Sequence, residues 1–234
     1  MNRSNKTFGA LLACCLGLLL PPTDSRADSG HDHAWWSGKL SARLGVNAAL
    51  PQVDSGDLSA PSPSGTKVDI SNAYALGGGV NWTLDPHWSL DLPLGIPFKA
   101  RIRGDGAIAG VGDIGETRVV PVTGFVQYRF LDEKATVRPM LGMGLTYVNF
   151  VREKGNGTLT ALLNPGGAPV TLKIEDKFTF TAQAGATYNV NERMFVEAMV
   201  AFTPLKTRTT LSTGQTIDVR LNPVTAGVYV GYRY

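Results

Sequence analysis

Val224-Thr-Ala-Gly-Val-Tyr-Val-Gly-Tyr-Arg-Tyr234 is the stretch that decides the fold, because its side chains alternate strictly in character. Valine, alanine and tyrosine occupy the even positions, whereas the odd positions hold threonine, glycine, tyrosine and arginine. Such alternation predicts a strand with one apolar and one polar face. An open apolar edge invites aggregation, whereas a barrel that closes its last strand onto its first has no open edge. Because only helices and closed barrels satisfy every backbone polar group in lipid, we expect a transmembrane β-barrel.

The other end of the sequence carries the features of a secretory signal. Arg3 and Lys6 form a basic region, and residues 8–20 form an apolar run that is too short to span a bilayer. Small residues at 25–27 suit a signal-peptidase site. We therefore expect residues 1–27 to be cleaved. A lipoprotein cut before Cys14 is a less favoured alternative, because the apolar run continues past that position.

The expected mature chain, residues 28–234, has few groups that could carry chemistry. Both cysteines, Cys14 and Cys15, lie in the signal, so we expect no disulfide, no thiolate nucleophile and no cysteine-bound metal. Removing the signal lowers the net charge from +3 to +1, which leaves no field to attract nucleic acid. The length fits a single domain.

Alternating segments recur along the mature chain and predict an all-β fold. Eight strands are predicted, each close to the length that a tilted transmembrane strand needs. They cover residues 39–50, 72–84, 87–98, 119–130, 136–150, 177–188, 194–204 and 216–234.

The connections alternate in length as well. Short turns rich in turn-forming residues are predicted at 85–86, 131–135 and 189–193. Long connections are predicted at 51–71, 99–118, 151–176 and 205–215. An even strand count with short turns at one rim and long loops at the other is typical of bacterial outer-membrane barrels. We therefore expect an eight-stranded antiparallel barrel in the outer membrane, with both termini periplasmic and the long loops extracellular.

Aromatic residues gather at the predicted strand ends, as amphipathic rings do where a barrel meets lipid headgroups. Examples are Trp88 and Tyr234 at one rim and Tyr74 and Phe178 at the other. The alternative, a soluble β-sandwich with an aromatic core, does not explain this clustering.

The alternation along each predicted strand places several charged residues inside the barrel, near its periplasmic end, and they predict a plug there. An eight-stranded barrel has room inside for side chains or one small ligand, and buried charges need partners. The predicted ion-pair plug consists of Asp91, Arg129, Arg138, Glu197 and Arg233. The alternative is an ion pathway through these charges.

The remaining inward positions are small or apolar and predict a hydrophobic lumen that opens outward. These residues are Gly77, Phe125, Met140, Gly144, Val148 and Met199. A ligand pocket of this kind is mostly apolar.

His31 and His33 could bind a metal near the new N-terminus, but a solvated tail is favoured because few other ligands are available there.

Prolines in or beside strands suggest a lateral opening. Proline cannot donate a ladder hydrogen bond and so marks edges, bulges or breaks. Pro97 and Pro121 flank the 99–118 connection, and Pro204 and Pro223 flank the 205–215 connection. These prolines either form a lateral gate or only shape the exits of the loops.

Several segments together resemble the outer membrane protein W family, which includes the AlkL-type proteins. They are Leu94-Gly-Ile-Pro-Phe-Lys99, residues 115–130, residues 137–147, residues 191–196 and Val228-Tyr-Val-Gly-Tyr-Arg-Tyr234. The resemblance implies an eight-stranded barrel with a narrow hydrophobic channel, from which small hydrophobic molecules leave sideways into the membrane. The chain departs from the family in its long loop, residues 154–172, and because loops vary most between relatives, the substrate of a relative is not transferred to this chain.

We therefore expect a passive channel for small hydrophobic molecules rather than an enzyme, with no cofactor. The expected partners are these molecules, outer-membrane lipid and lipopolysaccharide, and the barrel-assembly machinery, which would recognise the C-terminal strand; no nucleic acid is expected. The alternatives are a structural or interaction barrel whose loops act as a receptor for colicin, phage or a surface partner, and a weak ion pore.

Overall fold

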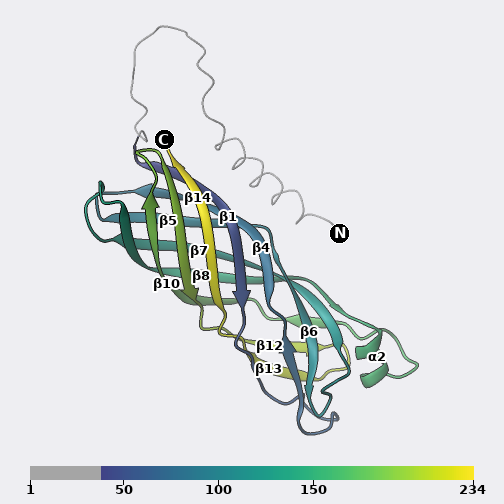
Figure 1. Ribbon diagram of the computed structural model, residues 1–234. Helices are drawn as coiled ribbons and strands as arrows, with labels where there is room; N and C mark the ends of the chain where they lie inside the picture. Colours follow the sequence, from purple (N-terminus) through teal and green to yellow (C-terminus); the bar gives the residue numbers. More distant parts are fainter. Residues whose placement is uncertain (1–37) are drawn as a thin grey trace, which may run out of the picture.

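The wall of the molecule is a closed antiparallel β-barrel of eight strands (Figure 1), seen in a computed structural model that describes residues 38–234. Each wall strand pairs with a neighbour on either side. Around the barrel they are β1 (Leu40–Leu50), β4 (Ala73–Thr83), β5 (Trp88–Gly95), β7 (Asp113–Arg129), β8 (Val137–Gly155), β10 (Lys177–Asn189), β11 (Met194–Phe202) and β14 (Val224–Arg233). No helix in the described part of the chain is long and apolar enough to cross a membrane.

The barrel closes where the sequence predicts, between the last strand and the first. β14 pairs with β1 from Ser41 opposite Arg233 to Leu50 opposite Val224. The apolar residues of β14, such as Val228 and Val230, are exposed on the outer face, while Tyr229 is buried inside. The alternation in the sequence therefore separates an apolar exterior from the interior, as a membrane requires.

The predicted long connections are not simple loops, because they hold further regular structure at one end of the barrel. We call this the long-loop end, and the opposite end, where Tyr234 lies with the short turns, the short-turn end (Figure 1). The additional elements are β2 (Asp54–Ser55), β3 (Thr66–Ile70), β6 (Phe98–Gly106), α2 (Gly157–Leu163), β9 (Leu172–Ile174), β12 (Lys206–Leu211) and β13 (Thr216–Arg220).

These elements extend the wall and cover its end. β3 and β6 lengthen the barrel sheet beside the first residues of β7, at the long-loop end. β2, β13, β12 and β9 form a separate four-stranded sheet. α2 has a defined start, because the side chain of its N-cap residue Asn156 accepts a hydrogen bond from the backbone N–H of Leu159.

Several predicted strand boundaries differ from the observed ones, and proline explains two of these differences. The predicted strand 216–234 is two strands, β13 and β14, which separate around Asn222-Pro223, where Asn222 has a left-handed φ of 34°. The predicted strand 87–98 ends at Gly95 just before Ile96-Pro97, and the chain resumes as β6. Conversely, β7 begins at Asp113 and β8 runs to Gly155, so both are longer than predicted.

The interior contains two apolar clusters separated along the barrel axis. The larger lies at the long-loop end and includes Ile102, Phe150 and Leu172. The smaller consists of Met140, Met199, Ala201 and Tyr229. Between the smaller cluster and the short-turn end, the interior is polar, and this is where the predicted plug lies.

Candidate functional site

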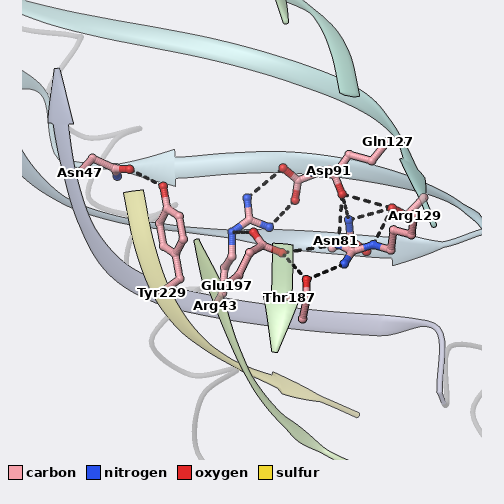
Figure 2. A network of polar contacts seen from close by, with 10 residues as sticks. Arg43, Asn47, Asn81, Asp91, Gln127, Arg129, Thr187, Glu197 and Tyr229 are labelled. Carbon is pink, nitrogen blue, oxygen red and sulfur yellow. Dashed lines mark hydrogen bonds and ion pairs between the residues drawn. The ribbon is translucent and has the colours of Figure 1, made fainter. Parts of the chain in front are cut away.

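The centre of the polar interior is Arg43 of β1, which lies between two carboxylates from other strands (Figure 2). Its Nη1 is 2.5 Å from Oδ1 of Asp91 and its Nη2 is 2.8 Å from Oδ2, so the pair is bidentate. Its Nε is 3.2 Å from Oε1 of Glu197. All three side chains are almost fully buried. Because an isolated buried charge is costly, this triad depends on all of its members.

Arg129 extends the network toward the short-turn end. Its Nη2 lies 3.6 Å from Oε2 of Glu197, and its Nη1 donates to Thr187 Oγ1 at 3.0 Å. Gln127 Oε1 accepts hydrogen bonds from Arg129 and from Asn81. These side chains come from four strands, β4, β7, β10 and β11, and meet across the lumen (Figure 2). The network thus joins opposite walls of the barrel.

Tyr229 covers the triad on the side of the long-loop end. The Arg43 guanidinium carbon lies 5.1 Å from the centroid of the Tyr229 ring, a cation–π contact. The Tyr229 hydroxyl donates to Oδ1 of Asn47. From Asn47 toward the long-loop end, the side chains in the lumen are neutral instead of charged.

Two of the five predicted plug residues, Arg138 and Arg233, do not join the ion pairs. Arg43, which was not among the five, is at their centre. Within residues 38–234, neither Arg138 nor Arg233 forms an ion pair. Arg138 donates instead to backbone carbonyls, including that of Pro86 at 2.6 Å, and Arg233 donates to Asn189. Both lie closer to the short-turn end, where backbone oxygens are available. Arg43 faces inward by phase in the sequence, but nothing there shows that it joins Asp91 to Glu197.

The six predicted lumen residues are all buried, but they do not form one continuous surface. Val148 belongs to the cluster at the long-loop end, whereas Met140 and Met199 belong to the smaller cluster beside the network. Phe125 covers Gly144, since a Cβ added at Gly144 would lie 2.7 Å from Phe125 Cδ1. Gly77 lies on the opposite wall, against the side chain of Asn47.

A row of threonine hydroxyls, which the sequence did not reveal, follows the inner wall over the neighbouring strands β7, β8 and β10 to Thr203, between the two apolar clusters. The Oγ1 atoms of Thr123 and Thr146 are 2.9 Å apart, those of Thr146 and Thr181 are 2.5 Å apart, and those of Thr181 and Thr203 are 3.0 Å apart. Gln183 is on the same face of β10 as Thr181, and both its amide atoms are buried without a partner among the described residues. The middle lumen is therefore neutral but polar.

An apolar cavity of about 190 Å³ lies at the long-loop end. It is enclosed by elements that the sequence suggested were loops, with Leu159 and Leu163 of α2 on one side and Ile217 of β13 on another. None of its lining residues is among the six lumen residues predicted from the sequence. The cavity can be predicted only once the additional sheet is known, because its walls come from segments far apart in the chain.

The wall has a gap between β5 and β7. β5 pairs with β7 only from Trp88 to Asp91, and β6 resumes the pairing at Phe98 opposite Val119. Residues 92–97 therefore face residues 120–124 with no ladder between them. The outer face of this region is apolar, with Leu92 and Val122 exposed.

Prolines account for part of this gap. Pro93 and Pro97 lie on one side and Pro121 on the other, and none can donate a backbone hydrogen bond. β5 remains paired with β4 across the same level, and β7 with β8. The interruption is therefore confined to a single seam of the barrel.

The second predicted gate does not contain such a gap. Thr203 donates its backbone N–H to the carbonyl of Pro223, and Leu221 donates to the carbonyl of Leu205. The carbonyl of Pro204 accepts from the Thr179 hydroxyl. Pro204 and Pro223 thus shape the exit from the barrel into β12 and β13, while the strands beside them stay connected.

Exposed ion pairs lie on the outer surface of the long-loop end. Arg208 of β12 forms a bidentate pair with Asp218 of β13, with distances of 2.7 and 3.1 Å. Hydrogen bonding to Arg208 lowers the pKa of the Asp218 carboxyl below its usual value. Such exposed pairs contribute little to stability. His31 and His33, for which a solvated tail was favoured over metal binding, and the predicted signal lie outside the described residues.

Known proteins similar to this chain share its architecture. The model of the OmpW family matches residues 36–234. Outer membrane protein W of Vibrio cholerae serotype O1 is 32% identical over 201 residues, which cover 84% of this chain and 89% of that protein. Outer membrane protein AlkL of Ectopseudomonas oleovorans is 22% identical over 187 residues, covering 80% of this chain and 75% of that protein. The crystal structure of OprG from Pseudomonas aeruginosa superimposes with a TM-score of 0.75 at 20% identity, covering 85% of this chain and 96% of that one.

Proposed function

Because this chain belongs to the OmpW family of outer-membrane barrels, we propose that it is a passive channel that admits small hydrophobic molecules and releases them sideways into the membrane. A guest enters the apolar cavity at the long-loop end, which faces the cell exterior, while both termini face the periplasm. The driving force is partitioning of apolar surface out of water, so the process needs neither catalysis nor a cofactor.

The closed network of charges supports a lateral exit rather than a path along the axis. An apolar guest that moved straight through would have to separate Arg43 from Asp91 and Glu197, and breaking a buried ion pair costs about 3–5 kcal/mol. The guest also has no polar groups with which to replace the lost contacts. The short-turn end is therefore a barrier for apolar molecules.

The gap between β5 and β7 is the observation that carries this proposal. It lies between the cavity and the charged network, on a face that is apolar outside. Elsewhere around the barrel, a guest would have to break ladder hydrogen bonds to pass through the wall. At residues 92–97 and 120–124, no such bonds need to be broken.

The proposal is tested by cross-linking β5 to β7 across the gap. In a variant without Cys14 and Cys15, Leu94→Cys and Val122→Cys would be joined across the gap by a short bifunctional thiol reagent. Leu90→Cys and Val126→Cys, which are paired on the same two strands, provide the matched control. We expect the first cross-link to reduce the protein-dependent uptake of labelled octane by cells at least tenfold, and the control cross-link to leave it unchanged. Equal uptake with the gap tied would contradict lateral release.

The receptor role remains an alternative that deserves a test, because the long-loop end presents a structured surface. Four strands and α2 display exposed side chains there, including the charged pair of Arg208 and Asp218. A weak ion pore is less well supported, since the charges in the lumen are paired with one another across it.

A further inference from the structure

Thr117 of β7 is a fully buried residue in the lining of the apolar cavity whose hydroxyl is left unsatisfied. Its side chain lines the cavity and the residue is 2% exposed. Its Oγ1 has no hydrogen-bond partner among the described residues. A hydroxyl can donate one hydrogen bond and accept two, and buried polar groups in native proteins are nearly always paired. An unpaired hydroxyl at this position therefore calls for a partner that enters the cavity.

The two other fully buried threonines that line the cavity, Thr66 and Thr207, do not have this property, and Thr209 is only partly buried. The hydroxyl of Thr66 donates to the carbonyl of Pro63 at 2.7 Å, and that of Thr207 donates to the carbonyl of Glu175 at 2.7 Å. Both are held by the protein itself. Around Thr117 the lining is apolar, with Ile102, Ile114 and Phe150 among its residues. A ligand in this cavity would therefore make mostly apolar contacts and one specific polar contact.

The size of the cavity limits the ligand to a small molecule. A protein cavity of roughly 150 Å³ lined by apolar side chains holds one benzene molecule. The cavity of about 190 Å³ can therefore accommodate one aromatic ring with a small substituent, or an aliphatic molecule of similar size. A longer chain would have to extend out of the cavity.

We propose that this cavity selects small hydrophobic molecules that carry one hydroxyl group, and that Thr117 binds this hydroxyl. The proposal rests on the channel function proposed above and narrows its substrate class. A guest hydroxyl can both donate to and accept from the Thr117 hydroxyl, whereas a hydrocarbon of the same shape leaves Thr117 unpaired. Since leaving a buried polar group unpaired is unfavourable, the cavity should discriminate between the two.

Benzyl alcohol and toluene test this discrimination, because they have nearly the same shape and differ in the hydroxyl. Each would be titrated into the full chain in lipid nanodiscs, with binding followed from the backbone amide signals of Thr117 and Phe150, and with empty nanodiscs used to correct for partitioning. We expect the wild-type protein to bind benzyl alcohol more tightly than toluene. In Thr117→Val, which keeps the shape of the side chain, this preference should fall by about 2- to 10-fold.

Two further variants separate the hydroxyl from the general properties of the cavity. Thr117→Ser keeps the hydroxyl and should retain the preference. Thr207→Val makes the same change in the same cavity, at a hydroxyl that the protein already engages, and should leave the ratio of the two affinities unchanged. Equal preferences in the wild type and Thr117→Val, or an equal loss in Thr207→Val, would overturn the proposal.

Uptake by cells distinguishes this proposal from the channel function. If the wild-type protein binds benzyl alcohol preferentially but raises the uptake of neither compound, the channel function fails while the binding site stands. If both compounds are taken up at rates that Thr117→Val does not change, and binding shows no preference, the channel function stands and the role of Thr117 is rejected.

Discussion

At the scale of single residues, Glu197 is the group on which the closed interior most depends. It contacts Arg43 through Oε1 and Arg129 through Oε2, and it also accepts from Thr187. Removing its charge would leave two buried guanidinium groups with one remaining carboxylate, that of Asp91. The cost falls mainly on Arg43, whose side chain is almost fully buried, and less on Arg129, which is partly buried.

We predict that Glu197→Gln lowers the free energy of unfolding by about 3–5 kcal/mol and raises the single-channel conductance in planar bilayers. Urea unfolding of the barrel refolded in vesicles measures the first effect. Glu175→Gln, which removes a carboxylate from an exposed pair with Lys177, is the control and should change stability by less than about 1 kcal/mol. An unaltered conductance in Glu197→Gln would show that these ion pairs are not what closes the lumen.

The residues of the site differ in how far the sequence could predict them. Phase along a strand predicts that Asp91, Arg129 and Glu197 face inward, and the structure places them there in one network. Phase cannot predict which inward charge meets which, because that depends on the stagger between strands. This is why Arg43 was missed as the centre and why Arg138 and Arg233 were grouped with it. Thr117 gave no signal, since it lies in the predicted 99–118 connection and only the structure places it in β7.

At the scale of elements, the seam between β1 and β14 decides whether the barrel closes. Gly45 of β1 lies so close to β14 that a Cβ added there would be 2.0 Å from the backbone oxygen of Val228. A backbone atom cannot move aside as a side chain can, so any larger residue must push the two strands apart. The predicted closure of the last strand onto the first depends on this contact.

Gly45→Ala is therefore predicted to destabilise the barrel by about 3 kcal/mol. The fraction that keeps its folded mobility in unheated gel samples, together with urea unfolding, reports this loss. Gly124→Ala is the matched control, because a Cβ at Gly124 would have no atom within 4 Å, and its effect should stay within about 1 kcal/mol. Similar behaviour of the two variants would mean that the β1–β14 contact does not limit closure.

The elements of the wall could be predicted, whereas those of the long-loop end could not. Transmembrane strands alternate over many residues because one face meets lipid, and β14 or β4 shows this clearly. The strands β9, β12 and β13 have three to six residues each, so the alternation is too short to stand out. Their pairing partners are also far away in the sequence, as when β13 pairs with β2.

At the scale of the whole molecule, the arrangement of the long-loop end links binding at the surface with the cavity beneath it. α2 contributes Leu159 and Leu163 to the cavity, and Val170 is buried beside it. Deleting residues 154–172 would therefore open the cavity as well as remove the outer surface. That deletion therefore cannot separate a receptor from a channel.

The exposed tip at residues 165–168 can separate the two functions, because none of its side chains lines the cavity. We predict that Pro165→Ser together with Ala168→Ser, which leaves Gly166 in its left-handed conformation (φ 74°), keeps the uptake of labelled octane within about twofold of the wild type, since a change confined to exposed positions costs little stability. Leu159→Asp, which places a charge against the cavity, should instead reduce uptake at least tenfold in protein that still folds. Loss of a phage or colicin interaction in the tip variant, with uptake retained, would show that one barrel carries both functions on separate surfaces. If the tip variant lost uptake while remaining folded, entry would depend on the outer loop itself, and the cavity would no longer suffice to explain how a guest enters.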